Sequence, residues 1–288
     1  MAEFKFIGEA CTLGEGPLWH PLRERLYWFD IPAGKLMSCN AEGEQQRSWL
    51  FGEAASAAGW IDRDTLLVAT ASGLHKFDIN RGTWITLCPL EADNRITRSN
   101  DGRVAPDGSF WIGTMGYNLE PDAGAYYRYS KGRLAKILHP ITVPNSTCFS
   151  PDKKWAYISD TVQRLIWRWQ LDSEGNPIGE KQVHIDLRDK GAIPDGSVCD
   201  AEGFLWNAQW DGWKIVRYDP DGKEEWVIKL PVQRPTCPAF GGPDFKRLYI
   251  TSAQDGLSEE ALAAQPQAGK IIVIDLDIAG MAEYQVVL

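Results

Sequence analysis

The chain has 288 residues, of which 44% are hydrophobic, and it carries a net charge of −9 with no cluster of Lys and Arg. This charge argues against nucleic acid as a partner, because phosphates need a basic surface. No apolar run approaches the roughly 20 residues that span a bilayer, which argues against a membrane partner. Six scattered cysteines without a CxxC pair, and an N-terminus without a basic start and an apolar block, predict a reduced, cytoplasmic protein.

A unit of two strand-like runs around a tight turn returns six times along the chain, and further short apolar runs complete the copies. Equivalent positions at Pro17, Gly59, Arg103, Thr147, Ser197 and Pro238 lie 42, 44, 44, 50 and 41 residues apart. Four short strands in each period of about 40–50 residues are typical of a β-propeller. The sequence therefore predicts an all-β fold, a six-bladed β-propeller with four antiparallel strands per blade, as a single domain over residues 1–288. A β-sandwich or two small β-domains is the alternative, but neither explains six copies in phase.

The two ends of the chain fit a closed ring. Residues 6–10 (FIGEA) resemble residues 50–54 (LFGEA), which form the last run of the first unit. We therefore expect the N-terminal strand to complete the sixth blade and to remove the exposed edge of its sheet. Helical periodicity is nearly absent, and only residues 258–264 are expected to form a short helix.

In four of the six units, the residue six places before the tight turn is an oxygen donor. These residues are Glu15, Asn100, Asn145 and Asp195. Asn and Asp also occur before strands for reasons of turn formation, but Glu forms turns poorly. Equivalent positions of a closed repeat lie around one axis, just before the innermost strands, so these side chains are expected to converge at one mouth of the channel. Two carboxylates and an amide oxygen there would suit a divalent cation such as Ca²⁺, Mg²⁺ or Mn²⁺, and less typically Zn²⁺.

Other catalytic patterns are absent from the sequence. The four histidines show no H-x-x-H spacing, and no G-x-S-x-G motif or phosphate-binding glycine loop occurs. A histidine-bound zinc site of the protease type and a serine hydrolase are therefore not predicted.

At these positions the chain resembles the regucalcin/gluconolactonase family, also called the senescence marker protein family. The matching stretches are 13–17 (LGEGP), 98–102 (RSNDG), 113–115 (GTM), 144–146 (PNS), 194–196 (PDG) and 200–203 (DAEG). The resemblance implies a six-bladed propeller with one divalent metal ion in its channel and hydrolysis of sugar lactones.

The resemblance also implies roles for individual residues. Glu15, Asn145 and Asp195 would bind the metal, Asn100 would contact the substrate or its water, and Arg98 would reach the sugar. Two positions depart from the family pattern. Ser146 follows the amide ligand where relatives of the animal protein have Gly, and Asn118 stands where they have Glu, with Glu120 two residues later. We predict that Asn118 contacts the substrate from a lid over residues 116–123.

The resulting hypothesis is a divalent-metal-dependent lactonase that hydrolyses an aldonolactone or aldarolactone to the free acid. The metal, Ca²⁺, Mn²⁺, Mg²⁺ or Zn²⁺, would stabilise negative charge on the carbonyl oxygen. Asp195 would be both ligand and general base, and metal-bound hydroxide is the alternative nucleophile. A metal-dependent esterase or phosphotriesterase, and a non-catalytic propeller that binds metal or protein, remain alternative functions. The sequence leaves the oligomeric state open.

Overall fold

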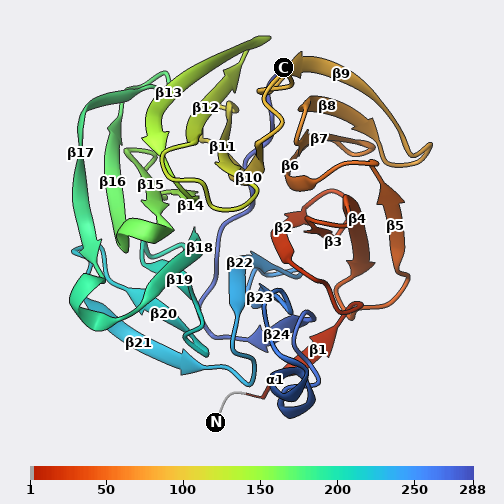
Figure 1. The fold of residues 1–288 in the computed structure, drawn as a ribbon, viewed down its shortest axis with the longest axis vertical. Coiled ribbons are helices and arrows are strands. Elements are labelled where there is room, and N and C mark those ends of the chain that lie inside the picture. Colours follow the sequence, from red (N-terminus) through yellow and green to blue (C-terminus); the bar gives the residue numbers. More distant parts are fainter. Residues whose placement is uncertain (1–2) are drawn as a thin grey trace.

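The computed structural model of the protein describes residues 3–288 and contains six four-stranded antiparallel sheets arranged in a ring (Figure 1). Each sheet forms one blade, whose first strand lies nearest the axis and whose fourth strand lies at the rim. This arrangement confirms the predicted all-β, six-bladed propeller.

The strands of the first five blades follow one another in the chain. Blade one contains β2 (Gly14–His20), β3 (Arg25–Asp30), β4 (Lys35–Asn40) and β5 (Arg47–Leu50), and blade two contains β6 (Ala55–Asp62), β7 (Thr65–Thr70), β8 (Gly73–Asp78) and β9 (Thr83–Pro89). Blade three contains β10 (Thr97–Val104), β11 (Phe110–Gly116), β12 (Gly124–Ser130) and β13 (Arg133–Ile141). Blade four contains β14 (Pro144–Phe149), β15 (Trp155–Asp160), β16 (Leu165–Leu171) and β17 (Pro177–Asp186), and blade five contains β18 (Ile193–Cys199), β19 (Leu205–Trp210), β20 (Lys214–Tyr218) and β21 (Glu224–Lys229). Two short 3₁₀ helices, η1 (Thr161–Gln163) and η2 (Arg188–Lys190), lie in blade four and after it.

Blade six is built from both ends of the chain. It contains β22 (Pro235–Gly241), β23 (Arg247–Ser252), β24 (Ile271–Asp275) and β1 (Lys5–Ile7), which pairs antiparallel with β24. The predicted closure by the N-terminal strand is thus confirmed. The short helix α1 (Glu259–Ala264) also forms where it was expected, with the Ser258 hydroxyl accepting a hydrogen bond from the Ala261 N–H. Within residues 3–288, no helix has the length and apolar character that crossing a membrane requires.

Aromatic side chains fill the wedges between neighbouring blades. Trp111 of blade three meets Phe149 of blade four edge to face at 5.5 Å, and Trp206 of blade five meets Phe240 of blade six at 5.9 Å. All four side chains are buried. Each such pair adds about 0.5–1.5 kcal/mol beyond the area that it buries, so the aromatic residues help to hold the blades at a fixed spacing.

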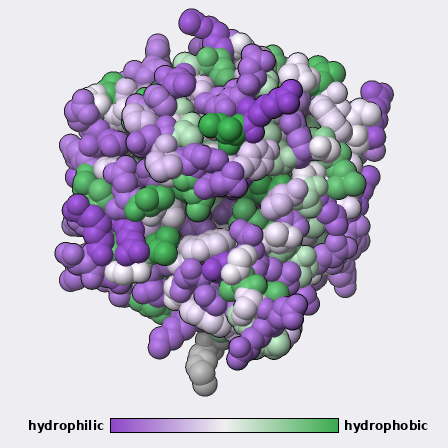
Figure 2. Space-filling model, viewed as in Figure 1, coloured by the Kyte–Doolittle hydropathy of each residue, from purple (hydrophilic) through white to green (hydrophobic). Residues whose placement is uncertain are grey.

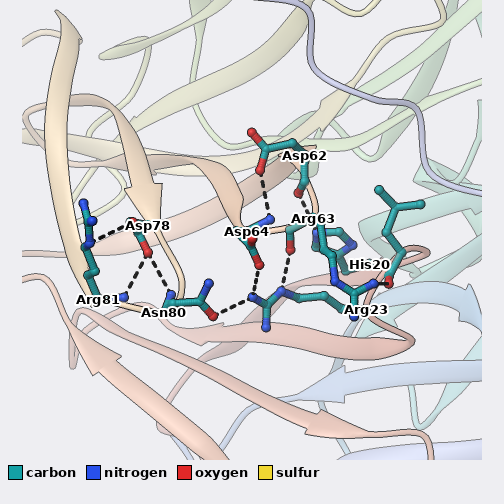
Figure 3. A network of polar contacts seen from close by, with 9 residues as sticks. His20, Arg23, Asp62, Arg63, Asp64, Asp78, Asn80 and Arg81 are labelled. Carbon is teal, nitrogen blue, oxygen red and sulfur yellow. Dashed lines mark hydrogen bonds and ion pairs between the residues drawn. The ribbon is translucent and has the colours of Figure 1, made fainter.

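Polar contacts join the turns of blades one and two on the face where the inner strands end (Figure 3). The Arg23 guanidinium donates to Asp64 Oδ1 at 2.6 Å and to Asn80 Oδ1 at 2.8 Å. His20 Nε2 lies 3.0 Å from the carbonyl oxygen of Asp62. Burial lowers the pKa of His20 to about 4, so its ring is neutral at pH 7 and serves packing between blades.

The C-terminal segment, residues 276–288, crosses the same face of the ring (Figure 1). Backbone hydrogen bonds join it to four blades, linking Gly280 to Phe245, Ala279 to Ala201, Val286 to Trp60 and Val287 to Gly108. The segment therefore ties together blades that are far apart in sequence, across the axis of the ring.

Candidate active site and metal centre

Each inner strand carries one extra residue near its beginning, so that its pairing with the second strand shifts there. The shifts lie between Glu15 and Leu18, Ala55 and Ala57, Ser99 and Gly102, Asn145 and Cys148, Pro194 and Ser197, and Pro235 and Pro238. Such β-bulges redirect side chains and are common beside active sites. The four predicted oxygen donors lie at these bulges, inside the inner strands. The expectation that they precede the strands is wrong, because each inner strand pairs with the second strand both before and after its bulge.

The pairing register divides the four donors into two kinds. Glu15 and Asn145 are the last paired residues before their bulges. Asn100 and Asp195 are the first unpaired residues within theirs. The donors therefore occupy two neighbouring register positions around the axis, although each stands six residues before a turn.

The residue after each donor of the first kind has a positive φ, which is 55° at Gly16 and 60° at Ser146. A Cβ atom on Gly16 would lie 2.3 Å from the carbonyl oxygen of Ser56, so this position requires glycine. Ser146 adopts the same conformation with a side chain, and its Oγ donates to the Asp195 carbonyl oxygen at 2.5 Å. This hydrogen bond joins the strand that carries Asn145 to the strand that carries Asp195.

The carboxyl groups of Glu15 and Asp195 are buried at the axis, with 7% and 5% of each residue exposed. Burial raises the pKa of Asp195 well above its usual range, and the nearby Glu15 carboxylate raises it further. Burial and the Asp101 carboxylate likewise raise the pKa of Glu15. The two groups thus lie in a region with too little positive charge to keep both ionised, and a cation between them would provide that charge.

Hydrogen bonds hold the amide of Asn145 in one orientation. Its Nδ2 donates to Thr161 Oγ1 at 2.8 Å, and that hydroxyl donates to the Pro194 carbonyl oxygen at 2.8 Å. On its other side, Asn145 Oδ1 accepts a hydrogen bond from Asn100 Nδ2 at 3.2 Å, and its second lone pair can bind a cation. An oriented amide oxygen beside two carboxylates is a suitable third ligand for a hard cation.

Arg98 and Asn100 form a connected pair at the mouth. Arg98 Nη1 donates to Asn100 Oδ1 at 2.8 Å and to the Ser99 carbonyl oxygen at 2.9 Å. Asn100 Nδ2 donates to the Pro144 carbonyl oxygen at 2.9 Å. Two of the three predicted substrate-binding residues, Arg98 and Asn100, therefore lie beside the candidate ligand Asn145. Viewed along the axis, the surface is mainly hydrophilic and is hollowed near its centre (Figure 2).

Asn118 lies in the exposed loop between β11 and β12 and contacts its own loop. Its backbone N–H and its Nδ2 both donate to the Glu120 carboxylate, each at 3.0 Å. The loop is attached to the preceding blade connection by a hydrogen bond from Tyr117 N–H to the Ile96 carbonyl oxygen at 2.9 Å. Within residues 3–288, no hydrogen bond joins Asn118 to the donors at the axis, so its role in substrate binding stays a prediction.

Two charged residues of the channel were missed by the sequence analysis. Asp101, next to Asn100, is buried, and its Oδ2 accepts a hydrogen bond from the Thr147 N–H at 2.6 Å. Arg103 is buried further along the same strand. The run of polar residues from 98 to 103 was the sequence feature that could have identified them, because a bulge turns consecutive side chains towards the axis. Counting six places back from the turn selects only one residue per blade.

The donor set fits a divalent cation of the oxygen-binding type. Among residues 3–288, no group of three or more His, Cys, Asp and Glu side chains converges as a metal cluster. The candidate site contributes two carboxylates, and its third donor is the amide of Asn145. Three protein ligands would leave coordination positions for water and substrate.

Comparisons with known proteins agree with the sequence motifs. Residues 13–254 match the SMP-30/Gluconolactonase/LRE-like region. An L-arabinolactonase from Azospirillum brasilense is 38% identical over 278 residues, covering 94% of this chain and 91% of that protein. A 6-deoxy-6-sulfogluconolactonase from Pseudomonas putida is 34% identical over 278 residues, covering 96% of each chain.

Solved structures show the same relationship. The crystal structure of a calcium-binding protein, regucalcin from Agrobacterium tumefaciens, is 37% identical, covers 97% of this chain and 95% of its own, and superposes with a TM-score of 0.95. The chain therefore belongs to the SMP-30/gluconolactonase/LRE-like family, as its motifs had indicated.

Proposed function

We propose that this chain is a lactonase that hydrolyses the lactone of a sugar acid to the free acid, with one divalent metal ion bound by Glu15, Asn145 and Asp195. The reaction class is supported by the relatives, since two proteins that match more than nine-tenths of the chain are named L-arabinolactonase and 6-deoxy-6-sulfogluconolactonase. A divalent metal is supported by the regucalcin from Agrobacterium tumefaciens, which is described as calcium-binding. Ca²⁺, Mn²⁺, Mg²⁺ and Zn²⁺ are the candidates.

The observation that carries this proposal is the pair of buried carboxylates, Glu15 and Asp195, beside the oriented amide of Asn145. A scaffold that bound only protein partners would have no need to bury two carboxyl groups whose pKa values are raised by burial and by neighbouring carboxylates. Buried acids with perturbed pKa values beside convergent polar groups are typical of an active site.

The residues suggest a division of work in ester hydrolysis. When bound, the metal would act as a Lewis acid toward the lactone carbonyl group. Asp195 would accept the proton of the attacking water, since its buried carboxylate has a higher proton affinity than an exposed one. Arg98 would donate to the sugar hydroxyls, and Asn100, already bound to Arg98, would hold the lactone ring in place.

A hydrolysis screen with a pH indicator tests the proposal. The purified protein is mixed with γ- and δ-aldonolactones and with aldarolactones, in the presence of each candidate metal and, separately, with a chelator. We expect acid release that requires a metal. Asp195→Asn should abolish hydrolysis. Asp152→Asn, at a turn on the opposite face, removes the same negative charge and should leave hydrolysis intact.

Three outcomes would contradict the proposal. Full activity in chelator would show that hydrolysis does not require a metal. Full activity of Asp195→Asn with metal still bound would show that Asp195 is not the general base. Hydrolysis of a phosphotriester without hydrolysis of any lactone would favour the alternative esterase function.

A further inference from the structure

One arginine occupies the axis of the ring beneath the candidate metal site. Arg103, on the inner strand of blade three, is 9% exposed. Its Nε donates to the Thr147 carbonyl oxygen at 3.1 Å, and its Nη2 donates to those of Ser197 and Pro238 at 3.2 and 3.4 Å. A single guanidinium group thus binds the inner strands of blades four, five and six to that of blade three.

The bonded carbonyl groups stand in a regular relation to the candidate ligands. Thr147 lies two residues after Asn145, within the bulge of that strand, and Ser197 lies two residues after Asp195, where pairing resumes after the bulge. The Thr147 peptide is also held on its other side, because its N–H donates to Asp101. The position of Arg103 therefore sets the distance between the two strands that carry these ligands.

The C-terminal segment supplies the countercharge for this arginine. Arg103 Nη1 forms an ion pair with the Glu283 carboxylate, and the side chains of both partners are at most 10% exposed. The segment holds Glu283 in place, since the indole N–H of Trp60 donates to the Glu283 carbonyl oxygen at 2.8 Å. A guanidinium buried without such a partner would be costly.

We infer that Arg103 is a positioning residue for the metal site, held there by the C-terminal segment through Glu283. This inference rests on the proposed function, because it assigns the metal to Asn145 and Asp195. Of the two partners, Arg103 lies within residues 13–254, which match the family, and Glu283 lies outside them. The guanidinium fork matters because one planar group must reach three carbonyl oxygens and a carboxylate at once.

The test measures metal affinity on the folded, full-length protein. Ca²⁺ and Mn²⁺ are titrated calorimetrically into the parent, Arg103→Lys, which keeps the charge but loses the fork, and Glu283→Gln, which keeps the shape but loses the charge. We expect each variant to raise the dissociation constant about tenfold, as changes in groups that orient metal ligands commonly do. Saturating metal should restore most of the lactonase activity of both variants.

A second ion pair of similar burial provides matched controls. Arg128 Nη2 lies 2.6 Å from Asp107 Oδ2, and Arg128 also donates to the Glu174 carbonyl oxygen of the next blade, away from the axis. Arg128→Lys and Asp107→Asn should lower the midpoint of thermal unfolding while leaving the metal dissociation constant within about twofold of the parent.

The inference is overturned if Arg103→Lys and Glu283→Gln bind metal as tightly as the parent, or if the controls weaken binding equally. Should Arg103→Lys fail to fold, Glu283→Gln decides alone. A parent that binds no divalent metal overturns both this inference and the proposed function. A parent that binds metal but hydrolyses no lactone overturns only the proposed function.

Discussion

Ser146 offers a direct test of how the chain holds its candidate ligands, because two effects of opposite sign meet at one buried residue. Its backbone has a φ of 60°, a conformation that favours glycine, and its hydroxyl donates to the Asp195 carbonyl oxygen at 2.5 Å. Ser146→Ala removes this hydrogen bond, together with the longer one that the hydroxyl accepts from Asn207 Nδ2 at 3.4 Å, and keeps the unfavourable φ. Ser146→Gly removes the same hydrogen bonds and relieves the backbone.

The expected free energies follow from these two terms. Loss of one buried hydrogen bond costs about 1 kcal/mol. The left-handed conformation costs a residue with a Cβ roughly 1–2 kcal/mol, and glycine avoids this. Ser146→Ala should therefore lower the free energy of unfolding by about 1 kcal/mol, and Ser146→Gly should leave it nearly unchanged. In an ordinary strand the order is reversed, because glycine is about 0.5–1 kcal/mol less favourable than alanine.

The assay is urea unfolding of both variants and the parent in chelator, so that changes in metal affinity do not enter the free energy. Ser159 is a matched control, since it is buried in the neighbouring strand and its Oγ has no hydrogen-bond partner among residues 3–288. There the alanine variant should be more stable than the glycine variant. If Ser146→Ala proves more stable than Ser146→Gly, the backbone strain assigned to this position is wrong.

Three further predictions concern the same site. Gly16→Ala should lower the free energy of unfolding by about 3 kcal/mol in urea titrations, since its Cβ would meet the Ser56 carbonyl oxygen at a positive φ. Arg98→Lys should raise KM for the lactone about tenfold in steady-state assays with little change in kcat, because one ammonium cannot replace the guanidinium fork. An unchanged KM would show that Arg98 does not bind the substrate. The pKa values of Glu15 and Asp195 are raised in the metal-free fold, so the folded protein keeps protons that the unfolded chain has already released. The stability of the metal-free protein should therefore fall as the pH rises from the unfolded-state pKa of each group to its folded-state pKa. Metal should displace those protons, and calorimetry from about pH 6 to 8 should show affinity rising up to tenfold per pH unit for each proton released; affinity independent of pH would refute this.

The fold could be predicted because each blade is a local unit. A period of tight turns and short apolar runs specifies four consecutive strands without any knowledge of distant contacts, and the likeness of residues 6–10 to 50–54 located the closing strand. The bulges could not be predicted. One extra residue in an inner strand changes which side chains face the axis, and counting from the turn cannot distinguish the last paired residue, as at Glu15, from the first unpaired one, as at Asp195.

The parts of the site that were missed depend on contacts with backbone groups. Arg103 binds three carbonyl oxygens and Asp101 binds a backbone N–H, and such backbone partners leave no side-chain pattern in the sequence. The carboxylate partner of Arg103, Glu283, lies 180 residues further along the chain, so no local pattern connects the two. The C-terminal segment is likewise held mainly by backbone hydrogen bonds to turns. For Asn118, the motif predicts a substrate contact, and in the structure its backbone N–H and its Nδ2 donate to Glu120, two residues away. The predicted contact stays a prediction.

The same contacts imply that the proposed metal site exists before the metal binds. Glu15 and Asp195 need no cation to bring them together, because both are carried by inner strands of a closed ring. The hydroxyl of Ser146 and the guanidinium of Arg103 fix the spacing of these strands through backbone oxygens, which do not depend on a cation. The metal-free protein should therefore remain folded, and metal at a hundred times its dissociation constant should add about 2.7 kcal/mol of stability. A protein whose ligands met only in the bound state would instead unfold in chelator.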